Sequence, residues 1–223
     1  LNLIKTANRF NIRKFIHVST DKAVKPTNIM GVSKRICELI LSSYAENSKN
    51  TLYSVVRFGN VIGSSGSAIP KFIKQIQNGG PVTLTHKNIT RFFMSVEEAT
   101  DLVIEAGNIS EGKETFLLDM GAPVKVYDLI LKIIKINGLE LKNDQNPNGN
   151  IEIKIIGLRP GEKLYEELLL SDKQYKTSNP KIYKGFEPYI KRENLMKLLK
   201  ELKIVIDKND EKKVLKTLKK LVP

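Results

Sequence analysis

The stretch Phe15-Ile16-His17-Val18-Ser19-Thr20-Asp21-Lys22 decides the fold class of this 223-residue chain. Its first five residues form a short, mostly apolar run with β-branched side chains, which is typical of a buried strand in a parallel sheet. The polar residues that follow are expected in a loop at the carboxyl end of that strand, where ligands bind in open α/β sheets. The stretch therefore predicts a parallel sheet with a candidate site at the end of one strand.

Helix and strand patterns alternate along the chain. Apolar residues recur at helical spacing in 3–10, 31–47, 72–76, 96–106, 126–134 and 163–170, and lysine-rich helices are expected after residue 192. Short apolar runs that predict further strands lie at 52–58, 115–120 and 151–156. Strands that alternate with helices indicate an α/β architecture with a mainly parallel sheet.

The composition limits the classes of protein to which the chain can belong. With 41% hydrophobic residues, a chain of 223 residues can bury a sizeable core, which excludes disorder along its whole length. The net charge of +13 favours anionic partners without identifying one, and a lysine-rich solvated surface explains it more simply. Cys37 is the single cysteine, and His17 and His86 lack the spacing of metal ligands, so neither a disulfide nor a metal site is predicted.

Two patterns are missing from the sequence. No apolar stretch reaches the roughly twenty residues that a membrane-spanning helix needs, and no signal-peptide pattern opens the chain, which is therefore expected to be cytoplasmic. No G-x-G-x-x-G turn follows a strand and opens a helix. The usual cradle for the pyrophosphate of a dinucleotide is thus absent from this sequence.

Asp21 and Lys22 are the first candidates for chemistry. A carboxyl group and an amine side by side can act as proton donor and proton acceptor when burial and mutual pairing tune their pKa values. Taken alone, such a dipeptide is more often an ion pair in a loop. Met30-Gly31-Val32-Ser33-Lys34 adds context, because it places a lysine one helical turn after Met30 at the start of a helix.

At this point the sequence resembles a known family. Short-chain dehydrogenases carry Tyr-x-x-x-Lys at this place. Three segments carry the resemblance here: Ser19-Thr20-Asp21-Lys22-Ala23, Pro26-Thr27-Asn28 and Ser33-Lys34-Arg35. With a methionine in place of that tyrosine, they resemble the CapD-type polysaccharide-biosynthesis enzymes, which are UDP-N-acetylglucosamine 4,6-dehydratases. Further segments that match the family in the same order are Arg57-Phe58-Gly59-Asn60-Val61, Gly63-Ser64-Ser65-Gly66-Ser67 with Ile69-Pro70, Thr90-Arg91-Phe92-Phe93-Met94, Leu118-Asp119-Met120-Gly121 and Gly157-Leu158-Arg159-Pro160-Gly161-Glu162-Lys163-Leu164-Tyr165-Glu166-Glu167-Leu168.

The resemblance implies the C-terminal part of such an enzyme. The expected fold is α/β, with an incomplete Rossmann-type parallel sheet whose N-terminal strands are missing and a smaller C-terminal substrate-binding α/β lobe. Residues 1–65 would end the Rossmann domain, and residues 66–223 would form mainly the substrate-binding lobe, with returning Rossmann elements and a lysine-rich helical tail. The open sheet edge would invite a complementing N-terminal chain or a second copy. Complete relatives are often membrane-anchored, and this chain would then be part of their cytoplasmic portion.

The resemblance also implies a redox-neutral reaction on a UDP-sugar, with NAD or NADP as cofactor. Hydride moves from C4 of the sugar to the cofactor, water is lost across C5 and C6, and the hydride returns to C6. Lys22 matches the family's base at C5, and Asp21 matches its acid at O6. Met30 cannot take the proton of the C4 hydroxyl, which leaves Asp21, Thr20 or water for that step, and the methionine form implies retained configuration at C5.

Other matched positions imply binding roles. Those matched to the cofactor site are Ser19, Lys34, Asn60 and Val61, with Lys34 on the nicotinamide ribose. Those matched to the substrate site are Asn60, Ser67, Ile69, Pro70, Arg91, Arg159 and Glu162. Arg91 and Arg159 are expected near the diphosphate, because a planar guanidinium suits paired phosphate oxygens. A surface salt bridge or a turn remains the alternative for each of these positions.

Two other functions stay open on the sequence alone. A chain that kept the substrate pocket without the cofactor half would be a non-catalytic nucleotide-sugar-binding or scaffolding module. The positive charge alone would fit nucleic-acid binding, but nothing in the sequence resembles a recognised nucleic-acid-binding module, so no such partner is predicted.

Overall fold

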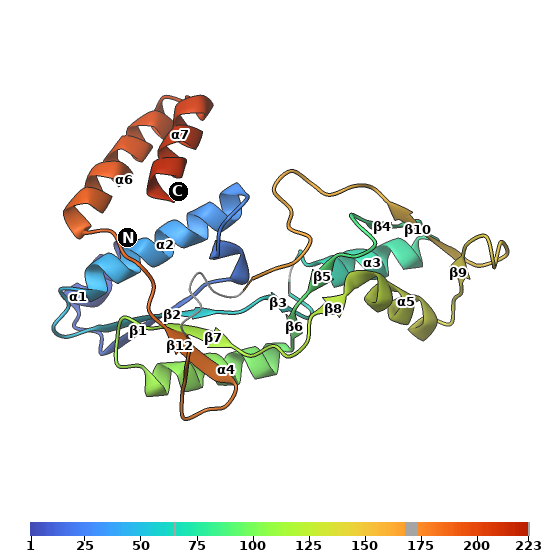
Figure 1. Ribbon diagram of the computed structural model, residues 1–223, viewed down its shortest axis with the longest axis horizontal. Coiled ribbons are helices and arrows are strands. Elements are labelled where there is room, and N and C mark those ends of the chain that lie inside the picture. Colours follow the sequence, from blue (N-terminus) through green and yellow to red (C-terminus); the bar gives the residue numbers. More distant parts are fainter. Residues whose placement is uncertain (65, 168–173, 223) are drawn as a thin grey trace. The chain divides into compact units, whose positions relative to one another are not determined.

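The computed structural model describes residues 1–64, 66–167 and 174–222 (Figure 1). The chain divides into two compact units, of which the first comprises Leu1–Phe58, Asp101–Asp119 and Glu167–Pro223. The second unit comprises Gly59–Thr100 and Met120–Glu166, so the chain leaves and re-enters the first unit twice. The expected boundary near residue 65 between a cofactor-binding and a substrate-binding part stays a prediction.

A five-stranded sheet forms the centre of the first unit, in the order β1-β2-β7-β12-β11. β1 (Lys14–Val18), β2 (Leu52–Arg57) and β7 (Thr115–Leu118) run parallel, which confirms the predicted α/β fold class. β12 (Ile182–Gly185) and β11 (Tyr175–Lys176) add antiparallel strands that no sequence pattern predicts. The parallel strands bring their carboxyl ends to one edge of the sheet, where β1 leads into the predicted catalytic loop.

Helices cover both faces of the parallel strands (Figure 1). α2 (Ile29–Ala45) packs an apolar face that includes Leu39 against β2. On the opposite face, α4 (Val96–Ile109) approaches β1 so closely that Lys14 Nζ donates a hydrogen bond to the carbonyl of Gly107 at 2.8 Å. Both helices were predicted from the spacing of their apolar residues, and the structure confirms them. Together they bury the two faces of the strands, as a parallel sheet requires.

The two ends of the chain pack onto the α2 side of the sheet. α1 (Asn2–Arg9), α6 (Arg192–Asp207) and α7 (Glu211–Leu221) share one core cluster with α2 and β2. Leu195 of α6 and Leu221 of α7 are among its fully buried members. The lysine-rich amphipathic helices predicted after Arg192 are thereby confirmed as a helical hairpin.

The second unit is built from short strands and two longer helices. Its strands are β3 (Asn60–Val61), β4 (Val82–Leu84), β5 (Thr90–Arg91), β6 (Phe93–Met94), β8 (Val124–Lys125), β9 (Leu141–Lys142) and β10 (Ile151–Ile155). β10 lies between β4 and β9 with parallel pairing on both sides, whereas β3 pairs with β6 and β5 with β8. α3 (Ala68–Gln77) and α5 (Val126–Ile136) complete a core that includes Ile130, Ile134 and Ile151.

The helix predicted at residues 163–170 is absent from the part of that segment that the structure describes. Residues 163–167 are not helical, and residues 168–170 of the same prediction lie outside the described residues. The carbonyl of Leu164 accepts hydrogen bonds from the backbone N–H of Thr90 and from Arg91 Nη1 instead of from an amide one turn later. The segment is therefore held by β5 rather than by its own helical hydrogen bonds.

β1 is an edge strand, because among the described residues it pairs with β2 alone. Val18 at its end and the nearby residues Leu3 and Phe10 are exposed. The open edge and the exposed apolar helix face expected from the sequence are thus present, whereas a covering chain stays a prediction. Within the described ranges, every helix is too short or too polar to cross a membrane.

Candidate functional site

The loop after β1 extends the pairing of the sheet before it turns. Ser19 N donates to the carbonyl of Val56 at 2.8 Å, and Asp21 N donates to the carbonyl of Phe58 at 3.1 Å. Residues Asp21–Ala23 then form a single 3-10 turn, in which Thr20 Oγ1 accepts from Lys22 N at 3.4 Å. The sheet therefore fixes the backbone of the predicted catalytic residues directly.

Asp21 and Lys22 are paired in this loop. Lys22 Nζ lies 2.9 Å from Asp21 Oδ1, and Thr20 Oγ1 donates to the same oxygen at 2.8 Å. The Asp21 side chain is fully buried, and its second oxygen, Oδ2, has no hydrogen-bond partner among the described residues. A buried carboxylate oxygen without a partner is costly, which is typical of a group that meets a ligand.

The first turn of α2 packs directly on this loop. Asn28 caps the helix by accepting from Gly31 N at 2.9 Å. A Cβ atom added to Gly31 would lie 2.2 Å from the carbonyl oxygen of Lys22, so only glycine permits this approach. Met30 is exposed beside this contact, and Lys34 follows one helical turn later, half-buried.

His17 is the penultimate residue of β1. Burial lowers the pKa of His17 below its ordinary value, the charge of Lys34 lowers it further, and the charge of Glu38 opposes this shift. His17 Nε2 is buried without a hydrogen-bond partner among the described residues. The sequence predicted no metal site at His17 and gave it no other role.

A cluster of four buried charged residues, the buried ion cluster, lies beneath the loop and consists of Arg35, Glu38, Arg57 and Glu187. Arg57 Nε and Nη2 donate to the two carboxylate oxygens of Glu38 at 2.8 and 2.7 Å, and Arg57 Nη1 donates to Glu187 at 2.8 Å. Burial alone would raise the pKa of Glu38, but the hydrogen bonds and charge of Arg57, together with the Ser19 hydrogen bond and the Arg35 charge, outweigh it and lower that pKa. No sequence pattern predicted this cluster.

In the second unit, three of the predicted substrate residues lie together. Arg91 Nη2 lies 3.5 Å from Glu162 Oε1, and Arg91 Nε lies 3.7 Å from Glu166 Oε1. Glu162 Oε2 also accepts from the backbone N–H of Arg159 at 3.1 Å. The Arg159 side chain is exposed, whereas that of Arg91 is mostly buried by these contacts.

The remaining predicted residues of the second unit belong to its framework. Asn60 donates to the carbonyl of Phe92 through both its backbone N–H and Nδ2, each at 3.1 Å. Val61 pairs with Met94, and Ile69 packs against the apolar core of the unit. Ser67 begins α3, and its Oγ is buried without a hydrogen-bond partner among the described residues.

Pro70 is exposed in the first turn of α3. Ser65, which belongs to the glycine-rich motif, lies outside the described residues. The predicted catalytic residues thus all belong to the first unit, and the predicted substrate residues belong to the second.

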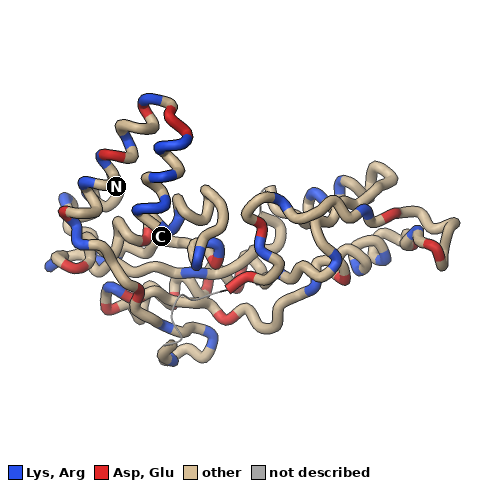
Figure 2. Tube along the Cα trace, turned by 45° about the horizontal axis from the view of Figure 1, so that its top comes forward, with Lys and Arg blue, Asp and Glu red and all other residues tan. Residues whose placement is uncertain are grey.

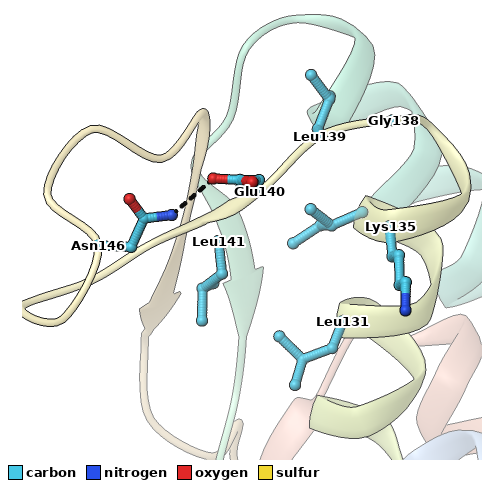
Figure 3. A pocket seen from close by; sticks show the side chains of 8 residues that line it. Leu131, Lys135, Gly138, Leu139, Glu140, Leu141 and Asn146 are labelled. Atoms are coloured by element: carbon cyan, nitrogen blue, oxygen red, sulfur yellow. Dashed lines mark hydrogen bonds between the residues drawn. The ribbon is translucent and has the colours of Figure 1, made fainter.

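A pocket of about 550 Å³ lies at the end of α5 in the second unit (Figure 3). Its walls include Leu131, Leu139 and Leu141, and at its rim Asn146 Nδ2 donates to Glu140 Oε2 at 2.9 Å. None of the predicted site residues lines it. Figure 2 shows Lys and Arg along the whole trace with acidic residues among them, which fits a solvated surface better than a nucleic-acid groove.

Comparisons with known sequences agree on one family. The family model described as "Polysaccharide biosynthesis protein" matches residues 1–187. The chain is 46% identical over 194 residues to the capsular polysaccharide biosynthesis protein CapD of Staphylococcus aureus, covering 86% of this chain and 31% of that protein. It is 35% identical over 184 residues to a UDP-glucose 4-epimerase of Rickettsia rickettsii, covering 82% of this chain and 51% of that protein. The chain therefore spans between about a third and a half of these relatives.

Solved structures give the same result for the fold. The X-ray structure of Pen from Bacillus thuringiensis is 37% identical with a TM-score of 0.73, covering 86% of this chain and 58% of that chain. A dTDP-glucose 4,6-dehydratase from Bacillus anthracis, solved in complex with NAD, is 17% identical with a TM-score of 0.58, covering 71% of this chain and 54% of that chain. The second likeness shows a shared fold only.

Proposed function

Because the chain belongs to the family of polysaccharide biosynthesis proteins, we propose that it is the substrate-handling part of a nucleotide-sugar 4,6-dehydratase. The proposed substrate is UDP-N-acetylglucosamine, the proposed cofactor is NAD or NADP, and the reaction would take place in the cytoplasm. The observation that carries the proposal is the contact between the buried Asp21 and the half-buried Lys22 at the carboxyl end of β1. An acid and an amine in direct contact are the groups that the elimination of water requires.

The pair fits the proton transfers of the elimination. Once C4 is a ketone, Lys22 takes the proton from C5, the C6–O bond breaks, and Asp21 gives its proton to the departing hydroxyl, which leaves as water. These roles need a neutral amine and a protonated carboxyl group. The carboxyl proton is the one that leaves the C4 hydroxyl during oxidation, and Lys22 enters the elimination as the free amine, with its own proton released to solvent. Lys22 Nζ and Asp21 Oδ1 lie 2.9 Å apart, so both groups face the same part of the sugar. Desolvation by a bound sugar would favour the uncharged amine.

Thr20 offers a route for the first proton. Met30 has no basic atom, so the proton of the C4 hydroxyl must leave through another group. Thr20 Oγ1 already donates to Asp21 Oδ1 at 2.8 Å, so it can accept from the sugar while passing its own proton to Asp21. We assign it this relay role. The configuration at C5 is proposed to be retained, because the proton returns to C5 from the same lysine.

The cofactor would be held at its nicotinamide end. The cofactor would supply the hydride chemistry of the reaction, as acceptor of the hydride from C4 and as its donor to C6. Lys34 is the proposed ligand of the nicotinamide ribose, since it is half-buried one helical turn after Met30 in a helix that begins directly against the Asp21–Lys22 turn. Ser19, Asn60 and Val61 are proposed to lie along the same cofactor. A segment with a glycine-rich phosphate turn, in the same polypeptide or in another, would hold the rest and pair with the open edge of β1.

The second unit is proposed to bind the UDP moiety. Arg91 already contacts Glu162 and Glu166, so its proposed role is to orient Glu162 towards a ribose hydroxyl. Arg159, whose side chain is exposed, is the proposed ligand of the diphosphate. Asn60, Ser67, Ile69 and Pro70 are proposed to form the walls around the sugar and the base.

Epimerisation at C4 is the second candidate, favoured by the 35% identity to a UDP-glucose 4-epimerase. An epimerase also oxidises C4, but it returns the hydride to C4 and needs no proton transfer at C5 or O6. In that reaction Asp21 would still take the proton of the C4 hydroxyl through Thr20, but Lys22 would have no proton to take from C5. We therefore favour dehydration.

Replacing Lys22 with Met tests the proposal. In the complete polypeptide that contains this chain, the exchange of the sugar C5 proton with deuterium oxide should fall about 100-fold or more, as expected when a general base is removed. Lys25→Met is the matched control, because Lys25 is a more exposed lysine of the same loop, paired with Glu167 at 2.7 Å. Exchange that persists in Lys22→Met would rule out this base.

Ligand binding by the chain, taken together with turnover by the complete polypeptide, distinguishes a dehydratase from a silent module. UDP-N-acetylglucosamine should raise the melting temperature of the second unit by mass action. The shift should be lost in Arg159→Ala and kept in Arg13→Ala, an exposed arginine of the first unit. Normal binding with no conversion by the complete polypeptide would favour the non-catalytic module.

A further inference from the structure

The buried ion cluster stands directly behind the catalytic loop. Glu38 accepts four hydrogen bonds, from Ser19 Oγ at 2.7 Å, from Arg57 Nε and Nη2 at 2.8 and 2.7 Å, and from Arg35 Nη1 at 3.0 Å. Ser19 is the residue immediately before Thr20. The carboxylate is thus one hydrogen bond away from the segment that carries the acid and the base.

The cluster also joins segments that are distant in the sequence. Glu38 and Arg35 come from α2, Arg57 from the end of β2, and Glu187 from the segment between β12 and α6. Arg57 Nη1 donates to Glu187 at 2.8 Å, and Arg35 Nη2 donates to the carbonyl of Pro188 at 3.3 Å. Two arginines and two glutamates balance formally, so the cluster carries no net charge.

Stability does not explain why charged residues occupy this position. Arg57 and Glu38 are 0% and 1% exposed, and removing such groups from water costs several kcal/mol per ion. Well-packed apolar residues of similar volume often give equal or greater stability. Charged groups at fixed angles, in contrast, define distances and orientations between the elements that they join.

The contacts of α2 define the distance between Lys34 and the loop that carries Asp21 and Lys22. Glu38 lies one helical turn after Lys34, on the same side of the helix. Gly31 contacts the carbonyl of Lys22 at the start of α2, and Glu38 holds Ser19 further along. These two contacts fix α2 against the loop on both sides of Lys34.

We infer that Glu38 is a positioning residue of the site: through Ser19 it sets the Thr20-Asp21-Lys22 turn at a fixed place relative to Lys34, and Arg57, Arg35 and Glu187 hold it there. The effect of Glu38 on catalysis rests on the proposed function, whereas its effect on the position of the loop does not depend on any reaction. The segment at Glu187 and Pro188 thereby becomes part of the support of the site.

Amide hydrogen exchange on the isolated chain tests the effect on the loop. Glu38→Gln keeps the shape of the side chain but offers the arginines one oxygen instead of two. The amides of Asp21, Ala23 and Val24, bonded to the carbonyls of Phe58, Thr20 and Asp21, should exchange about tenfold faster or more in this variant, because opening of the loop becomes easier.

Glu114→Gln is the matched control. Glu114 is 2% exposed and accepts from Ser54 Oγ at 2.8 Å and from Glu111 N at 2.9 Å, but it precedes β7 at the opposite end of the parallel strands. Unchanged loop exchange in Glu38→Gln, or an equal increase in Glu114→Gln, overturns the inference. If Glu38→Gln does not fold, Ser19→Ala removes only the connecting hydrogen bond and must give the same acceleration.

Steady-state kinetics on the complete polypeptide separate this inference from the proposed function. Glu38→Gln should lower kcat about tenfold to 100-fold and leave KM for UDP-N-acetylglucosamine within about threefold, whereas Glu114→Gln should change neither. A full kcat in Glu38→Gln contradicts the positioning role while the dehydratase assignment stands. If the unchanged polypeptide forms no dehydrated sugar, the proposed function fails, and the hydrogen-exchange result alone decides whether Glu38 positions the loop.

Discussion

Gly31 sets the distance between α2 and the Asp21–Lys22 turn. A Cβ atom at this position would lie 2.2 Å from the carbonyl oxygen of Lys22 and 3.0 Å from Cβ of Pro26. Gly31→Ala must therefore push the helix or the loop away, and we expect the free energy of unfolding to fall by about 1–3 kcal/mol, as in other overpacked sites. Urea denaturation of the isolated chain measures this change.

Gly107→Ala provides the control for this measurement. Gly107 lies within α4, where an added Cβ would meet only Ile16 Cγ1 at 3.4 Å, and alanine is the better helix former. This variant should be neutral or slightly more stable. An equal loss of stability in both variants would show that the contact between Gly31 and Lys22 is not a special constraint.

His17 gives a pH dependence whose direction can be derived. Burial and the charge of Lys34 lower its pKa in the folded chain, whereas the unfolded chain keeps the ordinary value of about 6.5. The unfolded chain therefore binds more protons below that pH, so the free energy of unfolding should fall as the pH drops from 7 to about 5.5. The slope should decrease in His17→Gln and persist in His86→Gln. Equal slopes in the unchanged chain and in His17→Gln would contradict the depressed pKa.

At this scale the sequence predicted the local part of the site and missed the long-range part. Asp21 and Lys22 are adjacent residues at the end of a recognisable strand, so a local pattern was enough to find them. Glu38 and Arg57 come from a helix and a strand, and each alone resembles a solvated charge. Only their mutual hydrogen bonds keep them buried, and that contact has no local signature.

The hairpin of α6 and α7 is the element whose packing can be tested most simply. Leu195 is 1% exposed in the core cluster that also contains α2 and β2, whereas Leu215 on the same hairpin is 48% exposed. Leu195→Ala should lower the free energy of unfolding by about 2–5 kcal/mol, the usual cost of removing a buried leucine side chain. Urea denaturation with fluorescence or circular dichroism measures it.

Leu215→Ala is the control within the same hairpin, and it should change the free energy of unfolding by less than about 0.5 kcal/mol. A similar small effect of Leu195→Ala would mean that the hairpin is not packed on α2. Such a result would also count against a fixed position of Glu187 in the buried ion cluster, because the segment that carries Glu187 leads into α6.

The predicted elements were those with a strong pattern of their own. α2 and α5 bury a periodic apolar face, and the strands β1, β2, β7 and β10 are short apolar runs, so the sequence reveals both kinds of element. β11 and β12 have no such pattern, since Tyr175 and Lys176 are both exposed and the pairing with β7 is antiparallel. Segment 163–167 depends on hydrogen bonds to β5, which a helical pattern cannot anticipate.

For the whole molecule, the two units divide the proposed tasks. The first holds the acid, the base and the lysine of the cofactor site on one parallel sheet, and the second holds the residues proposed for the UDP moiety. The open edge of β1 is where the proposed segment with the glycine-rich turn would pair. Most of the net charge of +13 lies in the first unit, with its lysine-rich tail, so the charge by itself does not mark the unit proposed to bind the sugar nucleotide.

The product formed by the complete polypeptide decides whether this chain belongs to a 4,6-dehydratase. UDP-N-acetylglucosamine and NAD(P)+ should be incubated with the complete polypeptide in deuterium oxide and the sugar analysed by NMR. We expect a 4-keto-6-deoxy sugar with deuterium at C5 and unchanged C5 configuration. A C4 epimer that keeps its C6 hydroxyl and carries no deuterium at C5 would contradict this expectation.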